Sequence, residues 1–241
     1  MKKKMDVSQS QINLFRKCPY AYYLRYEFKK QPIMFDPSVM EVGKKVHTAI
    51  ERYYRDCFQT EASKDEILYN IYSILKLDWD VLLPADYLRK AYQCLKHFSE
   101  FEFNNINNGN EVKPLSELKI KADGLYGIID YFSPNKEKVI DFKTNTKAYI
   151  GYDNKMQAVM YKILIKQKFN IDINYFTLQF LYPGEVRTIK FDKKLEKIEE
   201  DLYDYVKKIE EAWRRNHFPK LPRTEKTCNG CDYKYYCGGV D

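Results

Sequence analysis

Two aspartates and a lysine in the second half of the chain have the residue types and the spacing of a divalent-cation site. Asp141 and Lys143 lie two residues apart in a short β-prone segment, so their side chains point to the same face of a strand. Asp130 lies in the preceding β-prone segment, and a turn over 133–136 would bring it beside Asp141. Converging carboxylates suit hard cations such as Mg²⁺ or Mn²⁺, which keep waters that can attack a phosphodiester. Lys143 could orient or deprotonate the attacking water, or neutralise charge that develops on the phosphate.

Three further side chains could complete such a site. His47 follows Gly43 by one helical turn, and a small residue at that position admits the close approach of another element. Gln157 and Tyr161 are four residues apart and therefore share one face of a helix. Each signal has an ordinary alternative, because an Asp-x-Lys tripeptide is common and a lone helical histidine is more often a core residue. The combination, rather than any one residue, points to chemistry.

Cysteines form a second possible site. Cys228, Cys231 and Cys237 supply three thiolates within ten residues, and a four-ligand metal ion or cluster needs one more. The candidates for the fourth ligand stand alone in the first half of the chain: Cys18, Cys57 and Cys94. The spacing alone leaves both a four-cysteine zinc site and a 4Fe-4S cluster open.

The elements that must position these residues follow from hydrophobic periodicity and turn residues. Helices are predicted over 8–26 with an interruption at Pro19, 39–58, 64–104 with a break at Pro84, 152–168 and 193–215. Strands are predicted over 112–120, 125–132, 138–142, 171–182 and 185–191. The first three strands form a predicted meander and the last two a hairpin. Helices before, between and after strands indicate an α/β or α+β sandwich.

The composition describes a globular chain and argues against several classes of protein. Of 241 residues, 44% are hydrophobic and 31% charged, and no stretch approaches the roughly 20 apolar residues of a membrane helix. No segment has the pattern of a signal peptide, so we expect a cytoplasmic protein, in which cysteines are more often metal ligands or buried thiols than disulfides. A net charge of +7 permits nucleic-acid binding without establishing it.

The order of these motifs resembles that of the RecB-like branch of the PD-(D/E)xK nuclease superfamily, which includes AddB-type nuclease domains and Cas-four-type CRISPR-associated nucleases. The resemblance covers roughly residues 8–54 and 111–240. In chain order, the matching pieces are Cys18–Pro19, Gly43 with His47, Gly127–Asp130, Val139–Thr144, Gln157 with Tyr161, and the terminal cysteine trio. The chain departs from the pattern at Tyr131–Phe132–Ser133, where relatives commonly carry an arginine and another acidic residue.

The resemblance implies a restriction-endonuclease-like α/β core with a central mixed β-sheet flanked by helices. It implies a single nuclease domain over residues 1–241, with a helical insertion over about 55–110. The implied metal ligands for Mg²⁺ or Mn²⁺ are His47, Asp130, Asp141 and the main-chain carbonyl of Phe142. Lys143 would be the catalytic lysine, Gln157 and Tyr161 would line the site, and Glu117 would support the ligands from behind.

The resemblance also selects Cys18 as the partner of Cys228, Cys231 and Cys237 in a 4Fe-4S cluster that ties the two ends of the chain together. Cys57 and Cys94 would then be buried thiols. Cations alternate with tyrosines over 20–26 and 233–236, and these segments could form one surface that stacks on unpaired bases.

We therefore expect a metal-dependent deoxyribonuclease, an exonuclease on single-stranded DNA ends, with a structural 4Fe-4S cluster. The resemblance implies a role in CRISPR adaptation or in DNA recombination and repair, with CRISPR adaptation proteins or a helicase as partners and no membrane contact. The alternative hypothesis is a non-catalytic iron-sulfur or zinc protein of the same fold that binds or scaffolds DNA.

Overall fold

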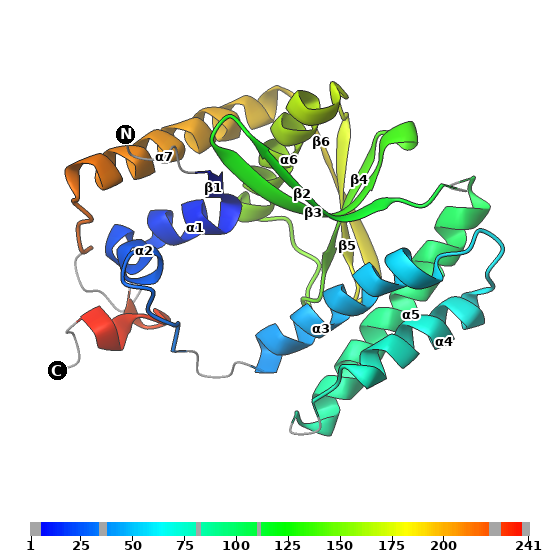
Figure 1. Cartoon of the computed structure of the whole chain (residues 1–241). Helices are drawn as coiled ribbons and strands as arrows, with labels where there is room; N and C mark the ends of the chain where they lie inside the picture. The colour runs from blue at the N-terminus through cyan, green and yellow to red at the C-terminus, as the bar shows by residue number, and fades with distance from the viewer. Residues whose placement is uncertain (1–5, 34–37, 81–82, 110–111, 222–227, 238–241) are drawn as a thin grey trace.

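A central mixed sheet carries the two aspartates and the lysine, and helices cover both of its faces (Figure 1). The computed structural model describes residues 6–33, 38–80, 83–109, 112–221 and 228–237. Within these residues the sheet has six strands: β1 (Val7–Ser8), β2 (Leu115–Ala122), β3 (Leu125–Ser133), β4 (Lys138–Lys143), β5 (Tyr175–Phe180) and β6 (Glu185–Lys190). The strand order is β1-β3-β4-β5-β6, and β2 also pairs with β3. The predicted α/β class with a central mixed sheet is confirmed.

Strand pairing follows the sequence in most places. β2, β3 and β4 form the predicted antiparallel meander, and β5 and β6 form the predicted hairpin. β4 and β5 are parallel, because helix α6 (Tyr152–Phe169) crosses over between them. The fifth strand is shorter than the predicted 171–182. β1, which pairs in parallel with β3, has two residues and therefore no alternating pattern to detect.

The helices before the meander are α1 (Gln9–Lys17), α2 (Pro19–Tyr26), α3 (Ser38–Arg52), α4 (Lys64–Leu77) and α5 (Ala85–Asn107), and the last long helix is α7 (Glu196–Arg215). The predicted helix 39–58 ends instead in a π-helical turn, η1 (Tyr53–Cys57). The predicted segment 64–104 is two helices, separated near Pro84 as expected. α4 and α5 form an antiparallel hairpin that packs beside α3 (Figure 1).

Local chemistry fixes the start of α1 and the position of Cys18. Ser8 and Gln11 form a capping box: the Ser8 hydroxyl accepts from the Gln11 amide, and the Gln11 side chain accepts from the Ser8 amide at 2.7 Å. Pro19 begins α2, where its missing amide hydrogen costs nothing. The residue before a proline avoids helical geometry, and Cys18 has φ −165° and ψ 114°. Cys18 therefore lies at a sharp junction between two helices.

Two hydrophobic cores lie on opposite faces of the sheet. Helices α1, α6 and α7 cover the first core, in which β3 and β4 place Phe132 and Val139. Helices α3, α4 and α5 cover the second, in which the neighbouring residues Tyr131 and Ile140 are buried. This alternation is the expected consequence of a strand's two-residue period. Each core thus anchors a different set of helices to the strands that carry the aspartates.

A buried polar network fastens the helical hairpin to α3 and to the sheet. Tyr54 in the π-helical turn donates to the Glu102 carboxyl of α5 at 2.7 Å. Asn105, one turn later, donates to the Tyr131 hydroxyl at 2.8 Å and accepts from Lys138 at 2.7 Å. The network therefore connects three elements that hydrophobic packing alone would leave free to slide.

None of the helices in the described part of the chain is long and apolar enough to cross a membrane.

Glu102 should make the stability of the protein depend on pH. Burial raises the pKa of Glu102 to about 7, although hydrogen bonds from Tyr54 and Asn105 lower it. An unfolded glutamate loses its proton near pH 4.5, so between pH 4.5 and 7 the folded state binds more protons and loses stability as pH rises. We expect the wild type to lose on the order of 2 kcal/mol relative to Glu102→Gln between pH 5 and pH 8, measured by urea unfolding. Parallel pH profiles for the two proteins would contradict this assignment.

Candidate active site

Three elements bring one imidazole and two carboxylates together. His47 comes from α3, Glu117 from β2 and Asp130 from β3. Nδ1 of His47 lies 3.5 Å from Oδ1 of Asp130 and 3.7 Å from Oε1 of Glu117. One potential ligand atom from each of the three side chains lies within 4.8 Å of the others. This arrangement has the donor types and the spacing of a site for one divalent cation.

Glu117 enters this group through an unusual backbone conformation. Its φ is 47°, in the left-handed region that residues other than glycine rarely adopt. The regular pairs of β2 with β3 flank it, at Ser116 with Tyr131 and at Leu118 with Ile129. The sequence predicted only a supporting role for Glu117, whereas the structure places it among the three potential ligands. An acidic residue in a predicted strand was the single signal, and φ cannot be deduced from it.

Asp130 and Asp141 lie just beyond the last regular pair of β3 with β4, which joins Tyr131 to Ile140. At this point the Phe142 amide donates to Oδ2 of Asp130 at 2.7 Å. The hydrogen bond attaches one predicted ligand to the strand that carries the other. The predicted metal contact of the Phe142 carbonyl stays a prediction.

A second network places Lys143 and fixes Asp141. The Lys143 ammonium lies 2.7 Å from Oδ2 of Asp141 and donates to Oε1 of Gln157 at 3.0 Å. Nε2 of Gln157 donates to Oδ1 of Asp141 at 2.6 Å and contacts the Tyr161 hydroxyl at 3.1 Å. Tyr161 in turn donates to the carbonyl of Ile128 in β3. The predicted pair on α6 therefore lies on the same network as the Asp-x-Lys motif of β4.

The electrostatics of the site favour a bound cation. Burial raises the pKa of Asp141; the neighbouring Asp130 raises it further, against the opposing effect of Lys143. Burial alone would lower the pKa of His47, but Asp130 and Glu117 outweigh it and hold that pKa well above its usual value. Oδ2 of Asp141 is buried and accepts no hydrogen bond, although it forms the ion pair with Lys143. Buried carboxylates that repel one another, with an imidazole beside them, fit a divalent metal.

Two hollows flank the Gln157 side chain. One, of about 500 Å³, is lined by Lys143 and by polar residues of the segment that follows it; the other, of about 210 Å³, is lined by Tyr161 and by the start of α1. Gln9 and Gln157 line both hollows, and Gln9 donates to the carbonyl of Asp153 at 3.2 Å. An extended substrate has room on both sides of the catalytic strand.

Comparison with known proteins assigns the fold to a family. The sequence profile of the PD-(D/E)XK nuclease superfamily matches residues 6–238. The chain belongs to this superfamily. A subunit of the ATP-dependent helicase/deoxyribonuclease of Clostridium botulinum (strain Loch Maree / Type A3) is 23% identical to this chain over 89% of its length. The chain spans 22% of that relative's length. The mixed sheet between two helical layers agrees with the restriction-endonuclease-like fold that the motifs implied.

The departure from the usual superfamily pattern after Asp130 has a structural explanation. Tyr131 and Phe132 are fully buried, one in each core, and Tyr131 accepts the hydrogen bond from Asn105. The two positions hold the helical layers onto β3. Polar support for the site comes from Gln157 and from the Phe142 amide instead.

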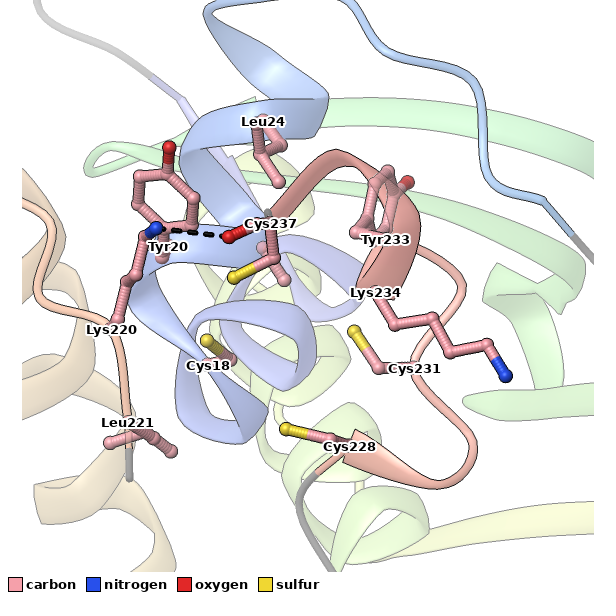
Figure 2. A pocket seen from close by; sticks show the side chains of 11 residues that line it. Cys18, Tyr20, Leu24, Lys220, Leu221, Cys228, Cys231, Tyr233, Lys234 and Cys237 are labelled. Carbon is pink, nitrogen blue, oxygen red and sulfur yellow. Dashed lines mark hydrogen bonds between the residues drawn. The ribbon is translucent and has the colours of Figure 1, made fainter. Parts of the chain in front are cut away.

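Four cysteines lie around one cavity at the opposite end of α1 from its capped start. Cys18 at the junction of α1 and α2 faces Cys228, Cys231 and Cys237 of the C-terminal segment (Figure 2). Leu24 and Tyr233 pack on the cavity, and Lys220 closes one side by donating to the Cys237 carbonyl at 3.0 Å (Figure 2). The two remaining cysteines lie elsewhere: Cys94 is buried in the second core, and Cys57 packs at its margin. The structure thus groups the four cysteines that the motif selected.

Aromatic rings and cations surround this cavity. Lys220 lies over the Tyr20 ring at 4.6 Å, and Lys30 lies over the Tyr236 ring at 5.4 Å. Tyr235 is 57% exposed, with Lys234 over its ring at 5.0 Å. Other rings of the tyrosine-rich segments are buried; Tyr22 is fully enclosed and packs on Phe218. The surface expected from sequence is therefore divided between core rings and exposed rings.

Gly127 should be required for the Tyr161–Gln157 pair. A Cβ atom at Gly127 would lie 2.8 Å from Leu164 and 3.0 Å from the Tyr161 ring. We expect Gly127→Ala to lower the free energy of unfolding by about 1–3 kcal/mol, the usual cost of overpacking, as measured by urea denaturation. Gly230→Ala is the matched control, because nothing lies within 4 Å of its Cβ position. Equal stabilities for the two variants would show that Tyr161 does not need this space.

Proposed function

We propose that the chain is a Mg²⁺- or Mn²⁺-dependent deoxyribonuclease. The observation that carries the proposal is the convergence of the His47, Glu117 and Asp130 ligand atoms beside the Asp141–Lys143–Gln157 network. Membership of a nuclease superfamily supports it. In the fold, this constellation lies where the sheet opens between α3 and α6. A non-catalytic scaffold would have no use for a buried, mutually repelling pair of aspartates.

Four groups would hold the cation: His47, Asp130, Asp141 and, as a fourth side chain, Glu117. A bound divalent cation supplies Lewis acidity, which activates water and stabilises charge on a phosphodiester. His47 must be neutral to bind it, so loading the site releases the proton that the carboxylates now hold on the imidazole. Lys143 keeps a cation beside Asp141, where it can orient the phosphate. Gln157 fixes both groups, because it bonds to each of them.

In the proposed reaction, the oxygen of water forms a bond to phosphorus as the bond from phosphorus to the leaving ester oxygen breaks. One proton of the water is lost to solvent and one proton is taken up by the leaving oxygen. Lys143 and Gln157 do not change covalently. Their contribution is to hold the phosphate and Asp141 in a fixed relation, which lowers the barrier by positioning.

We further propose that the substrate is a single-stranded DNA end. The two hollows on either side of Gln157 suit an extended strand, and the exposed ring of Tyr235 offers a stacking surface. The relative from Clostridium botulinum is part of a helicase/deoxyribonuclease, and helicases produce single strands. A helicase partner in recombination and repair therefore fits the substrate. A place in CRISPR adaptation, with adaptation proteins as partners in the cytoplasm, rests on the motif resemblance alone.

Replacing Asp141 by asparagine should remove cleavage without unfolding the protein. We expect a fall in rate of on the order of 100-fold or more, the scale seen when one stabilising group is lost from a preorganised site. The assay follows end-labelled single- and double-stranded DNA with Mg²⁺, with Mn²⁺ and with EDTA. Asp204→Asn is the control, because Asp204 is an exposed aspartate on α7 that pairs with Lys208 one turn along the same helix. Metal-independent cleavage, or no cleavage by the wild type, would contradict the proposal.

We propose that Cys18, Cys228, Cys231 and Cys237 hold a 4Fe-4S cluster. The four residues share one cavity, and the nearby thiols of Cys18 and Cys228 add to burial in raising the pKa of Cys231. A zinc ion bound at about 2.3 Å would hold the sulfurs about 3.8 Å apart. Among the described residues, only the His47 group has three potential ligand atoms within 4.8 Å of one another, so the sulfurs are spaced more widely than that. Wide spacing favours a cluster over a single ion.

The proposed cluster would be structural and would assist DNA binding. It would join positions 18 and 228, which are 210 residues apart in the chain, and so unite both ends in one domain. Closing a loop of that length stabilises a fold by several kcal/mol, about as much as a long-loop disulfide. It would also fix Tyr20 and Tyr235 on one surface.

Replacing Cys231 by serine should separate the structural role from hydrolysis. We expect loss of iron and of the brown visible absorption, a lower unfolding temperature and weaker binding of single-stranded DNA. Iron content, the visible spectrum, thermal unfolding and fluorescence anisotropy measure these effects. Cys57→Ser is the control, because Cys57 lies outside the cavity. A Cys231→Ser protein that stays folded and binds and cleaves DNA like the wild type would overturn this role, and zinc in place of iron would overturn the cluster.

A further inference from the structure

A third hollow lies on the other face of the sheet from Lys143. Its volume is about 350 Å³, within the range of small-ligand sites, and its walls come from the second half of α5 and from β4, β5 and β6. Gln179 and Phe180 are consecutive in β5, so their side chains point to opposite faces. Phe180 lines the hollow that contains Lys143, and Gln179 lines this one. The two hollows are therefore back to back on one strand.

Gln179 has an unsatisfied polar atom in this hollow. The residue is 3% exposed, and its Oε1 is buried without a hydrogen-bond partner. β5 places it opposite Phe142, in a strand whose neighbours are hydrophobic. A buried amide oxygen without a donor destabilises the folded state, so native proteins rarely retain one unless something else satisfies it. The hollow thus calls for a ligand that donates an N–H or O–H group.

The opposite wall supplies donors. Lys138 donates to the Asn105 side chain at 2.7 Å, and an ammonium group has three hydrogens to give. Its Nζ lies 5.6 Å from the centre of the Phe101 ring, which also lines the hollow. Acceptor, donor and apolar ring are thus presented together. A flat ligand with donors and acceptors along its edge would match all three.

The charge balance selects a neutral ligand. Glu100 lines the same hollow, and Glu102 lies behind it, with one carboxyl oxygen 3.4 Å from the Asn105 amide nitrogen. One ammonium therefore faces two carboxyl groups, which disfavours a phosphate or another anion. Nucleobases are neutral and flat and carry alternating donors and acceptors on their edge.

We propose that this hollow binds one unpaired nucleobase of a DNA strand. The proposal rests on the proposed function, because it takes DNA to be what the protein binds. A paired base cannot enter, since its edge is occupied by its partner and its faces by the stack. The hollow would thus add selectivity for single strands at a place distant from the aspartates.

The test is isothermal titration calorimetry of the whole chain, in EDTA, with deoxyadenosine, deoxycytidine, deoxyguanosine and thymidine in turn. We expect saturable binding of at least one nucleoside, and a loss of affinity of at least tenfold in Gln179→Leu, which keeps the size and removes the amide. Gln167→Leu is the matched control, because Gln167 lies exposed on α6 and contacts Asp123. Inorganic phosphate that binds this protein more tightly than any nucleoside, with the same dependence on Gln179, would overturn the proposal.

Thermal unfolding provides a second measurement. Without ligand, Gln179→Leu should unfold at a higher temperature than the wild type, because the unpartnered oxygen is gone; with nucleoside, only the wild type should gain stability. A lower unfolding temperature for the folded variant would show that the amide already has a structural partner, and would overturn the proposal. If Gln179→Leu does not fold, Lys138→Met is tested in the same way, with the same expected loss of affinity.

The outcomes for this hollow and for the nuclease site are separable. Asp141→Asn should lose cleavage and keep nucleoside binding. If the wild type cleaves DNA but binds no nucleoside, the base-binding proposal fails and the nuclease proposal stands. If nucleosides bind in a Gln179-dependent way but no DNA is cleaved, the reverse holds.

Discussion

The structure depends on holding two aspartates, Asp130 and Asp141, close together in a place from which water is largely excluded. Two like charges in such a place are unfavourable, as the raised pKa of Asp141 shows. The fold compensates for them with His47 and Lys143, one cation for each carboxylate. It also uses the Phe142 amide, which donates to Asp130 at the point where β3 and β4 stop pairing. The opening of the sheet and the fixing of a potential ligand are thus one event, and no backbone donor is wasted in it.

The helices follow from this constraint, because each compensating group comes from a different layer. α3 is held by the second core and delivers His47, whereas α6 is held by the first core and delivers Gln157. Both helices must come close to the sheet. At Gly43 a Cβ would meet the Thr144 hydroxyl at 3.2 Å, so the glycine sets how near α3 can lie to the strand end. The hairpin of α4 and α5 then stiffens α3 through the bond from Tyr54 to Glu102, two turns beyond His47.

Sequence patterns predicted the parts of the site that lie on one element. The two-residue spacing of Asp141 and Lys143 and the four-residue spacing of Gln157 and Tyr161 are local, and both pairs share a network in the fold. The Ser8 cap and the break at Pro84 are local as well. What failed depends on tertiary structure. Glu117 adopts its left-handed φ inside an ordinary strand pattern, and the π-helical turn buries Tyr53 and Tyr54 side by side, which a period of 3.6 residues does not allow. Gln179 is a single polar residue in an apolar stretch, and nothing in that pattern indicates a hollow beside it.

Buried polar atoms without hydrogen bonds show where this chain retains groups that only a ligand would satisfy. Among the described residues they include Oδ2 of Asp141 and Oε1 of Gln179, which belong to the paired strands β4 and β5 and face opposite sides of the sheet. Tyr53 and Glu102 contribute two more such atoms, but these lie together inside the second core, close enough for Glu102 to raise the pKa of Tyr53. A buried water between that tyrosine and that carboxyl would satisfy both, since a water needs two or more polar partners. Asp141 and Gln179 have no such mutual solution, because the sheet lies between them. Leucine at position 179 would improve the fold and remove a ligand contact, and this conflict between stability and recognition is the physical mark of a binding site.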